Sequence, residues 1–112
     1  MTAAILLRSA LKLISRQENW CTHYMARDRH QDEVRPDSEA ARRWSLDGAL
    51  LRCADLGTKN GQGDYHQAVQ YLRSMAKWKS LAEINDGRSH REIIEMLDRA
   101  AAGLSVAERI AA

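Results

Sequence analysis

The sequence contains no phenylalanine and one proline, Pro36, and aromatic residues make up only 5% of its 112 residues. Leu, Ile, Ala and the three tryptophans must therefore fill any hydrophobic core. Clusters of β-branched residues are absent, whereas Ala, Leu, Arg and Glu are plentiful, and this composition favours helices over strands. We therefore expect an all-α protein with a single helical domain over residues 1–112.

Cysteine and long apolar runs are also scarce. Cys21 and Cys53 are too few for a disulfide framework, so we expect two reduced thiols in a cytoplasmic protein. The sequence has no run of 18 apolar residues that would form a membrane-spanning helix, and we expect no membrane partner. Cys21 and His23 are possible metal ligands, but the remaining Cys and His residues lack the spacing of a structural zinc site. We therefore expect neither a metal nor another cofactor.

The sequence lacks the short motifs of common enzyme classes, namely the P-loop, GxGxxG, HExxH and GxSxG. We therefore expect a protein that is not an enzyme and that acts by binding. The alternative is a hydrolase or transferase that acts through Asp47, Asn85 or Asp86. Charge does not identify the partner, because 17 Lys and Arg residues are nearly balanced by 15 Asp and Glu residues.

Apolar residues recur with the period of amphipathic helices along most of the chain. The first predicted helix begins after Thr2, a suitable N-terminal cap, and only Ile5 departs from its apolar face. A second helix is predicted within residues 39–57, where Pro36 precedes the cap and Gly57 ends the helix.

The second predicted helix has apolar residues on more than one side, so we expect it to be central in the fold. Trp44 is expected to be buried on this helix with Leu50 and Leu51. Asp47 is expected to pair with Arg43 one turn earlier. Gly48 is expected to let a neighbouring helix approach closely.

Further helices are predicted in the second half of the chain. One is capped by Asp64, and Trp78 is expected to anchor its end in the core. Ser80 and Ser89 each begin a capping box that starts another helix, and a last short helix is expected after Gly103. These segments predict a compact bundle of four to five helices.

Regular periodicity is lost between residues 17 and 37, where charges of both signs are mixed with Trp20, Tyr24 and Met25. A loop of this length in a small protein is uncommon and is often functional when ordered. We expect one long ordered loop, with one end fixed to the core by its aromatic residues.

Residues 80–103 have the order of a helix-turn-helix motif: a short helix, a turn that contains Gly87, and a longer helix. In a DNA-binding regulator, Arg88, His90 and Arg91 would lie at the start of the recognition helix. The first helix is about two residues too short, and acidic residues on the exposed face of the second would repel phosphates. We therefore favour a tight helical hairpin, and DNA binding by this segment is the alternative.

Several short motifs occur together along the chain. They are Trp20-Cys21 with Arg27-Asp28, Trp44 with Gly48-Ala49-Leu50, and Asn85-Asp86 before an amphipathic helix that ends in LDRAA. As a set they resemble a family of small, mostly helical domains of unknown function found in bacteria and their phages. The resemblance covers nearly the whole chain and implies a helical fold without a defined activity. The family pattern commonly has Trp before Asn-Asp, where this chain has Ile84.

The residues shared with that pattern form the candidate site and allow two interpretations. In the structural one, Asn85 and Asp86 form a turn and Arg27 pairs with Asp28 to fix the loop. In the functional one, the side chains converge on one pocket or contact surface for a partner: Trp20, Arg27, Asp28, Asn85 and Asp86. We expect the partner to be another protein, with nucleic acid less well supported. The predicted role is regulatory, for example as a phage or mobile-element inhibitor of a host system or as a housekeeping accessory protein.

Overall fold

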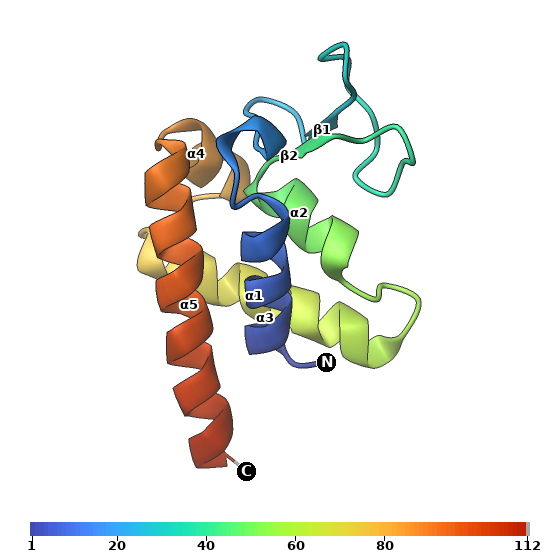
Figure 1. Ribbon diagram of the computed structural model, residues 1–112. Helices are drawn as coiled ribbons and strands as arrows, with labels where there is room; N and C mark the ends of the chain where they lie inside the picture. Colours follow the sequence, from blue (N-terminus) through green and yellow to red (C-terminus); the bar gives the residue numbers. More distant parts are fainter. Residues whose placement is uncertain (112) are drawn as a thin grey trace.

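The computed structural model describes residues 1–111, in which five α-helices surround one apolar core. The helices are α1 (Ala3–Leu13), α2 (Leu46–Cys53), α3 (Lys59–Met75), α4 (Leu81–Asp86) and α5 (His90–Ala111). The long connection between α1 and α2 contains a 3₁₀ turn, η1 (Gln17–Asn19), and two short strands, β1 (Ala26–Arg27) and β2 (Arg43–Trp44). Figure 1 shows α1 beside the long α5, with α3 crossing behind them and the strands above α2. The predicted all-α bundle with one long ordered loop is confirmed.

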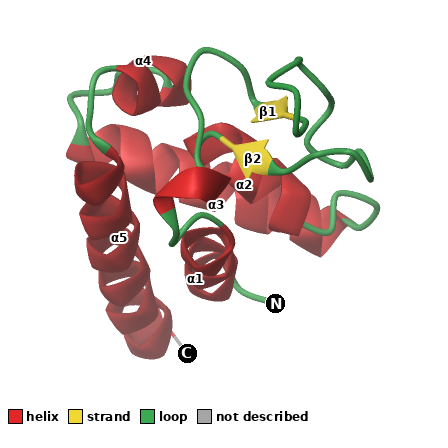
Figure 2. Cartoon of the chain, turned by 45° about the horizontal axis from the view of Figure 1, so that its top comes forward, coloured by secondary structure: helices red, strands yellow, loops and turns green. Residues whose placement is uncertain are grey.

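The pairing of α1 with α5 follows the apolar periodicity of both helices. Thr2 accepts a hydrogen bond from the Ile5 N–H and caps α1 as predicted, while the Ile5 side chain is 53% exposed. The buried residues of α5 are Ile93, Met96, Leu97, Ala100, Ala101 and Leu104. Helix α1 packs against α2, α3 and α5, so its apolar face supplies the middle of the core (Figure 2).

The prediction that Gly103 ends a helix is wrong. Helix α5 continues through Gly103 to Ala111. Gly103 lies where α5 passes close to the Tyr71 hydroxyl. A Cβ atom there would lie only 2.0 Å from the Tyr71 oxygen. The continued helix brings the Glu108 carboxylate to the first turn of α1, where Oε1 accepts the Ala4 N–H at 3.0 Å. This contact satisfies a backbone donor that has no partner within its own helix.

The predicted helix over residues 39–57 begins later in the structure. Helix α2 starts after Ser45, whose hydroxyl accepts the Gly48 N–H, and residues 43–44 form β2 instead. Trp44 is buried as predicted, at 7% exposure, but it lies on a strand. The predicted ion pair of Arg43 with Asp47 is wrong, because pairing of β2 with β1 takes Arg43 out of the helix.

Helix α3 begins earlier than predicted and ends differently. Thr58, not Asp64, is its cap, and accepts the Gly61 N–H at 2.9 Å. Trp78 is 57% exposed and is therefore not the predicted core anchor. Lys77 and Trp78 both have positive φ, which turns the chain away from the helix. No helix within residues 1–111 combines the length and the apolar character needed to cross a membrane.

Candidate functional site

The side-chain amide of Asn85 joins the long loop to two helices. Asn85 lies in α4 and is 1% exposed. Its Oδ1 accepts the Trp20 indole N–H at 2.7 Å and the Leu46 backbone N–H at 3.0 Å. Its Nδ2 donates to the Cys21 carbonyl at 3.1 Å and to Asp86 Oδ1 at 3.2 Å. These contacts use both lone pairs and both N–H groups of the amide, so the loop is fixed to the start of α2 and to α4 by one buried group.

Three other residues of the candidate site hold unusual backbone conformations in place. His23 and Gln31 have φ of 73° and 70°, which costs a residue other than glycine about 1–2 kcal/mol. Asp86 accepts the His23 N–H at 2.9 Å, and Arg27 donates to the Gln31 carbonyl at 2.8 Å. Asp28 accepts two backbone N–H groups of the turn that contains Gln31. The predicted pairing of Arg27 with Asp28 is therefore wrong. Both side chains bind the backbone of the loop and stabilise its strained turns.

The loop also contacts α2 through its backbone. A Cβ atom on Gly48 would lie 1.8 Å from the Met25 carbonyl oxygen, so only glycine fits at this position. The Ser45 N–H donates to the same Met25 oxygen at 3.0 Å, and the Trp44 indole donates to the Pro36 carbonyl at 3.0 Å. The close approach predicted at Gly48 therefore exists, but the neighbour is a loop and not a helix.

Two clefts border this loop. The first, here named the cationic cleft, has a volume of about 330 Å³ and is lined by Gln17, Trp20, Cys21, Thr22, Arg27, Gln31 and Arg43. The second, the acidic cleft, has a volume of about 210 Å³, and its lining includes Tyr24, Met25, Glu33, Asp47, Asn85 and Asp86. The clefts differ in the sign of their charged side chains, so they suit different ligands.

Asp47 is a half-buried carboxylate in the acidic cleft. Burial raises its pKa, and a hydrogen bond from the Tyr65 hydroxyl, 2.6 Å from Oδ1, acts in the opposite direction. Burial and the Asp47 carboxylate together raise the pKa of Tyr65. Asp47 therefore acts as the hydrogen-bond acceptor that joins α2 to α3.

Burial disfavours the thiolate form of both cysteines. Burial raises the pKa of both Cys21 and Cys53, although Arg27 and Arg43 act in the opposite direction on Cys21. The Cys21 Sγ faces the Tyr24 carbonyl, at 3.6 Å. In the part of the chain that the structure describes, no three His, Cys, Asp or Glu side chains are grouped in a way that would hold a metal ion.

The residues of the DNA-binding alternative are engaged within the protein. The Arg88 side chain lies 3.5 Å from the Ile84 carbonyl oxygen, and Arg91 pairs with Glu95 at 3.1 Å. His90 Nε2 lies 2.6 Å from the Ile14 carbonyl oxygen, and its ring packs against the Trp20 indole. Arg88 and His90 are thus partly engaged within the fold, whereas Arg91 and the turn residues Gly87 and Ser89 are exposed.

The structure brings together only part of the predicted site. Trp20, Asn85 and Asp86 meet through hydrogen bonds, and Arg27 shares the cationic cleft with Trp20, whereas Asp28 lies in the turn of residues 28–32. Arg43, which the sequence did not single out as a site residue, faces the cationic cleft because β2 pairs with β1. No local signal in the sequence indicates that pairing.

The comparisons with known proteins identify the family of the chain but do not bear on its fold or its motif residues. Ile84, which stands where the resembled pattern often has Trp, is fully buried in the core. No curated protein and no solved structure matches the chain significantly. The family of unknown function DUF6197 matches residues 1–103, and the chain therefore belongs to this family.

Proposed function

We propose that this protein is a regulatory domain without enzymatic activity that binds another protein through the surface formed by residues 20–45 and α4. The observation that carries this proposal is the rigid presentation of two exposed apolar side chains. Tyr24 and Met25 are 42% and 45% exposed, although the Asn85 contacts and the strained His23 fix the backbone around them. Strained backbone and binding residues on rigidly held loops concentrate at functional sites.

The chemistry of this surface indicates the kind of partner. Tyr24 carries the Arg27 guanidinium over its ring at 4.5 Å, and Tyr and Arg are residue types that often dominate binding energy. Tyr24 and Met25 border the acidic cleft with Glu33 and Asp86. A protein segment with an apolar side chain next to Lys or Arg would complement both features.

We further propose a cytoplasmic setting in a bacterium or a phage-infected cell, in which the protein inhibits or assists a host system. Two observations support this setting. The motif set resembles domains from bacteria and phages, and Cys21 and Cys53 are both free thiols, which suit a reducing compartment.

The test compares two double variants that remove similar exposed apolar area. The first is Tyr24→Ser with Met25→Ser. The control is Ile5→Ser with Val106→Ser, at positions that are 53% and 46% exposed on α1 and α5. The wild type is used to capture partners from a bacterial extract, and the captured protein is then purified and titrated against the wild type and both variants.

We expect the captured protein to bind the first variant at least about tenfold more weakly, since an interface anchor contributes on the order of 2 kcal/mol. The control variant should bind as the wild type does. Equal binding by both variants, with unchanged thermal unfolding, would show that this surface is not the docking site.

A further inference from the structure

The pairing of β1 with β2 places two arginines directly opposite each other. The antiparallel register matches Arg27 with Arg43 and Ala26 with Trp44. Opposite residues on an antiparallel ribbon project from the same face, with Cβ atoms about 4.5–5.5 Å apart. Like charges at such a position repel each other, so this pair destabilises the ribbon unless an anion lies between the two groups.

Carboxylates of the protein do not neutralise this pair. The side chain of Arg43 makes no ion pair within residues 1–111. A backbone hydrogen bond lowers the pKa of Glu18, with smaller contributions from Arg16 and then Arg43, and this exposed carboxylate is paired with Arg16. Arg27 donates to the carbonyls of Thr22 and Gln31, which leaves its other N–H groups for a ligand.

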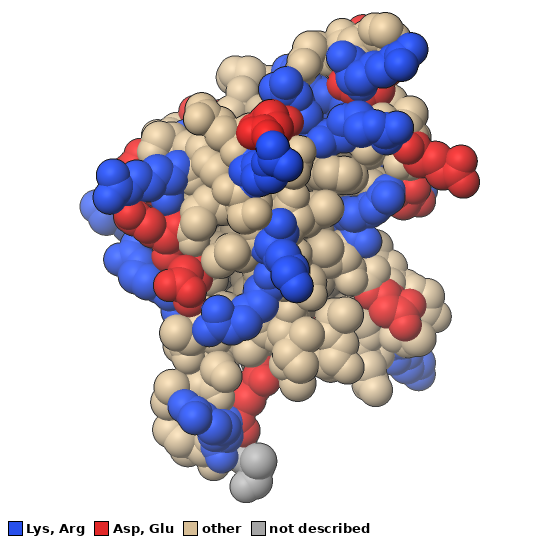
Figure 3. Space-filling model, in the orientation of Figure 1, with Lys and Arg blue, Asp and Glu red and all other residues tan. Residues whose placement is uncertain are grey.

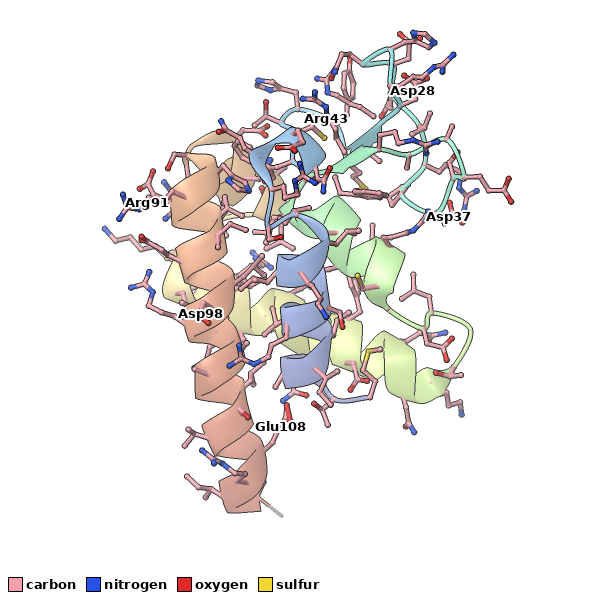
Figure 4. All side chains as sticks on the ribbon, viewed as in Figure 1. Asp28, Asp37, Arg43, Arg91, Asp98 and Glu108 are labelled. Carbon is pink, nitrogen blue, oxygen red and sulfur yellow. The ribbon has the colours of Figure 1, made fainter. Side chains whose placement is uncertain are left out.

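The two guanidinium groups line a cleft that can hold a small ligand. The cationic cleft has a volume of about 330 Å³, and no carboxylate lines it. This volume lies within the range of about 300–1,000 Å³ that is usual for ligand sites. Figure 4 shows Arg43 over the strands, and Figure 3 shows several Lys and Arg side chains around this end of the molecule.

We propose that the cationic cleft binds a phosphate group between Arg27 and Arg43. The planar fork of a guanidinium matches phosphate oxygens, and a phosphate dianion balances two positive charges. The half-buried Trp20 ring lines the same cleft, so a phosphate ester with a planar body would gain a packing surface. This site lies in the same 20–45 segment as the proposed protein-docking surface and shares Arg27 with it, but it occupies the cationic cleft, and its test does not need a protein partner.

The test is a titration with inorganic phosphate. The NMR signal of the Trp20 indole N–H reports binding at each step. Sodium chloride at matched ionic strength is the control for screening. We expect a saturable shift with phosphate only. Arg43→Gln should weaken binding about tenfold, the factor expected for loss of a charge-assisted contact. Arg29→Gln makes the same change in net charge at an exposed position outside the cleft and should leave binding unchanged.

A second arm of the experiment identifies the source of the phosphate. Tighter binding of phenyl phosphate than of inorganic phosphate would support a site for a phosphate ester that packs on Trp20. Equal binding would support a site for free phosphate. A shift that chloride reproduces, or equal weakening by Arg43→Gln and Arg29→Gln, would overturn the proposal. Because Arg43 has no ion partner within residues 1–111, thermal unfolding should show that its variant is folded.

Discussion

The α1–α5 pair and the segment of residues 20–45 are held by different forces. The helix pair buries a periodic apolar face, and its ion pair, Arg8 with Asp98 at 3.5 Å, lies in solvent. The 20–45 segment exposes large side chains and is held by directional hydrogen bonds, most of all those of Asn85. Apolar packing is distributed over many atoms, whereas a hydrogen-bond network depends on a few groups. We therefore expect single polar substitutions to disrupt the segment as strongly as core truncations disrupt the helix pair.

Asn85→Ala tests this comparison most directly, and we expect the largest effect from it. The change leaves the Trp20 N–H, the Leu46 N–H and the Cys21 carbonyl without their partner. The free energy of unfolding should fall by about 3–6 kcal/mol, since each buried group left without a partner costs about 1–3 kcal/mol. A urea titration measures it beside Leu97→Ala in α5, for which about 2–5 kcal/mol is expected. A loss below about 1 kcal/mol for Asn85→Ala would contradict the central role of this amide.

Trp44→Ala should cost about 3–5 kcal/mol of unfolding free energy, because it removes the main buried side chain of the short ribbon. Trp44→Phe is the matched variant, since it keeps an aromatic ring and removes the hydrogen bond to Pro36. It should cost less. Equal losses for the two variants would mean that the indole N–H, and not the buried area, stabilises this part of the molecule.

Two glycines provide a smaller test of backbone contact. Gly48→Ala should destabilise by about 1–3 kcal/mol as overpacking does, because the new methyl would meet the Met25 carbonyl. Gly63 is also helical, but apart from its own helix backbone and chain neighbours nothing lies within 4 Å of the place that a Cβ atom would take there. Gly63→Ala should stabilise by about 0.5–1 kcal/mol through helix propensity. Changes of the same sign in thermal unfolding would refute the close contact of the loop with α2.

Asp47→Asn should alter the pH dependence of stability by a smaller amount. Burial raises the Asp47 pKa above 3.8, so the neutral form is favoured in the folded state. The protonated Asp47 side chain therefore contributes to the stability of the folded state below pH 3.8, the ordinary pKa of the group. This contribution is lost as the pH rises through the higher pKa of the folded state. The asparagine variant should therefore gain stability relative to the wild type between about pH 3 and about pH 7 in denaturant titrations. A relative loss over that interval would mean that the Tyr65 hydrogen bond outweighs the effect of burial.

The smallest effect is expected from Arg88→Ala combined with Arg91→Ala. Arg88 lies 3.5 Å from the Ile84 carbonyl oxygen, and the exposed Arg91 is paired with Glu95, next to other acidic residues of the same helix face. Binding of duplex DNA should stay in the non-specific range of roughly 10⁻⁴–10⁻⁶ M in both wild type and variant. Nanomolar binding of a selected sequence, lost in the variant, would establish the DNA-binding alternative.

Helix ends show how far the sequence alone specifies the fold. Thr2, Ser80 and Ser89 cap their helices as predicted, since a cap needs only residues within the next turn. The predicted end at Gly103 and the start near residue 39 are wrong, because distant groups decide them. The Tyr71 hydroxyl lies against Gly103 inside α5, and β1 draws residues 43–44 into a strand.

The candidate site shows the same limit. The motif set singles out Trp20, Asn85 and Asp86 as candidates, but their mutual contacts join residues up to 65 positions apart. Arg43 cannot be identified in this way, because its position opposite Arg27 exists only once β1 and β2 pair.

The sequence by itself determined the all-α class, the amphipathic helices and most of their caps, because periodicity and capping act over a few neighbouring residues. Only the tertiary structure decided that Asn85 holds the 20–45 segment and that Arg27 and Arg43 of this segment meet in the cationic cleft. Those contacts depend on how distant backbone segments are placed, and residue spacing along the chain does not encode that placement locally.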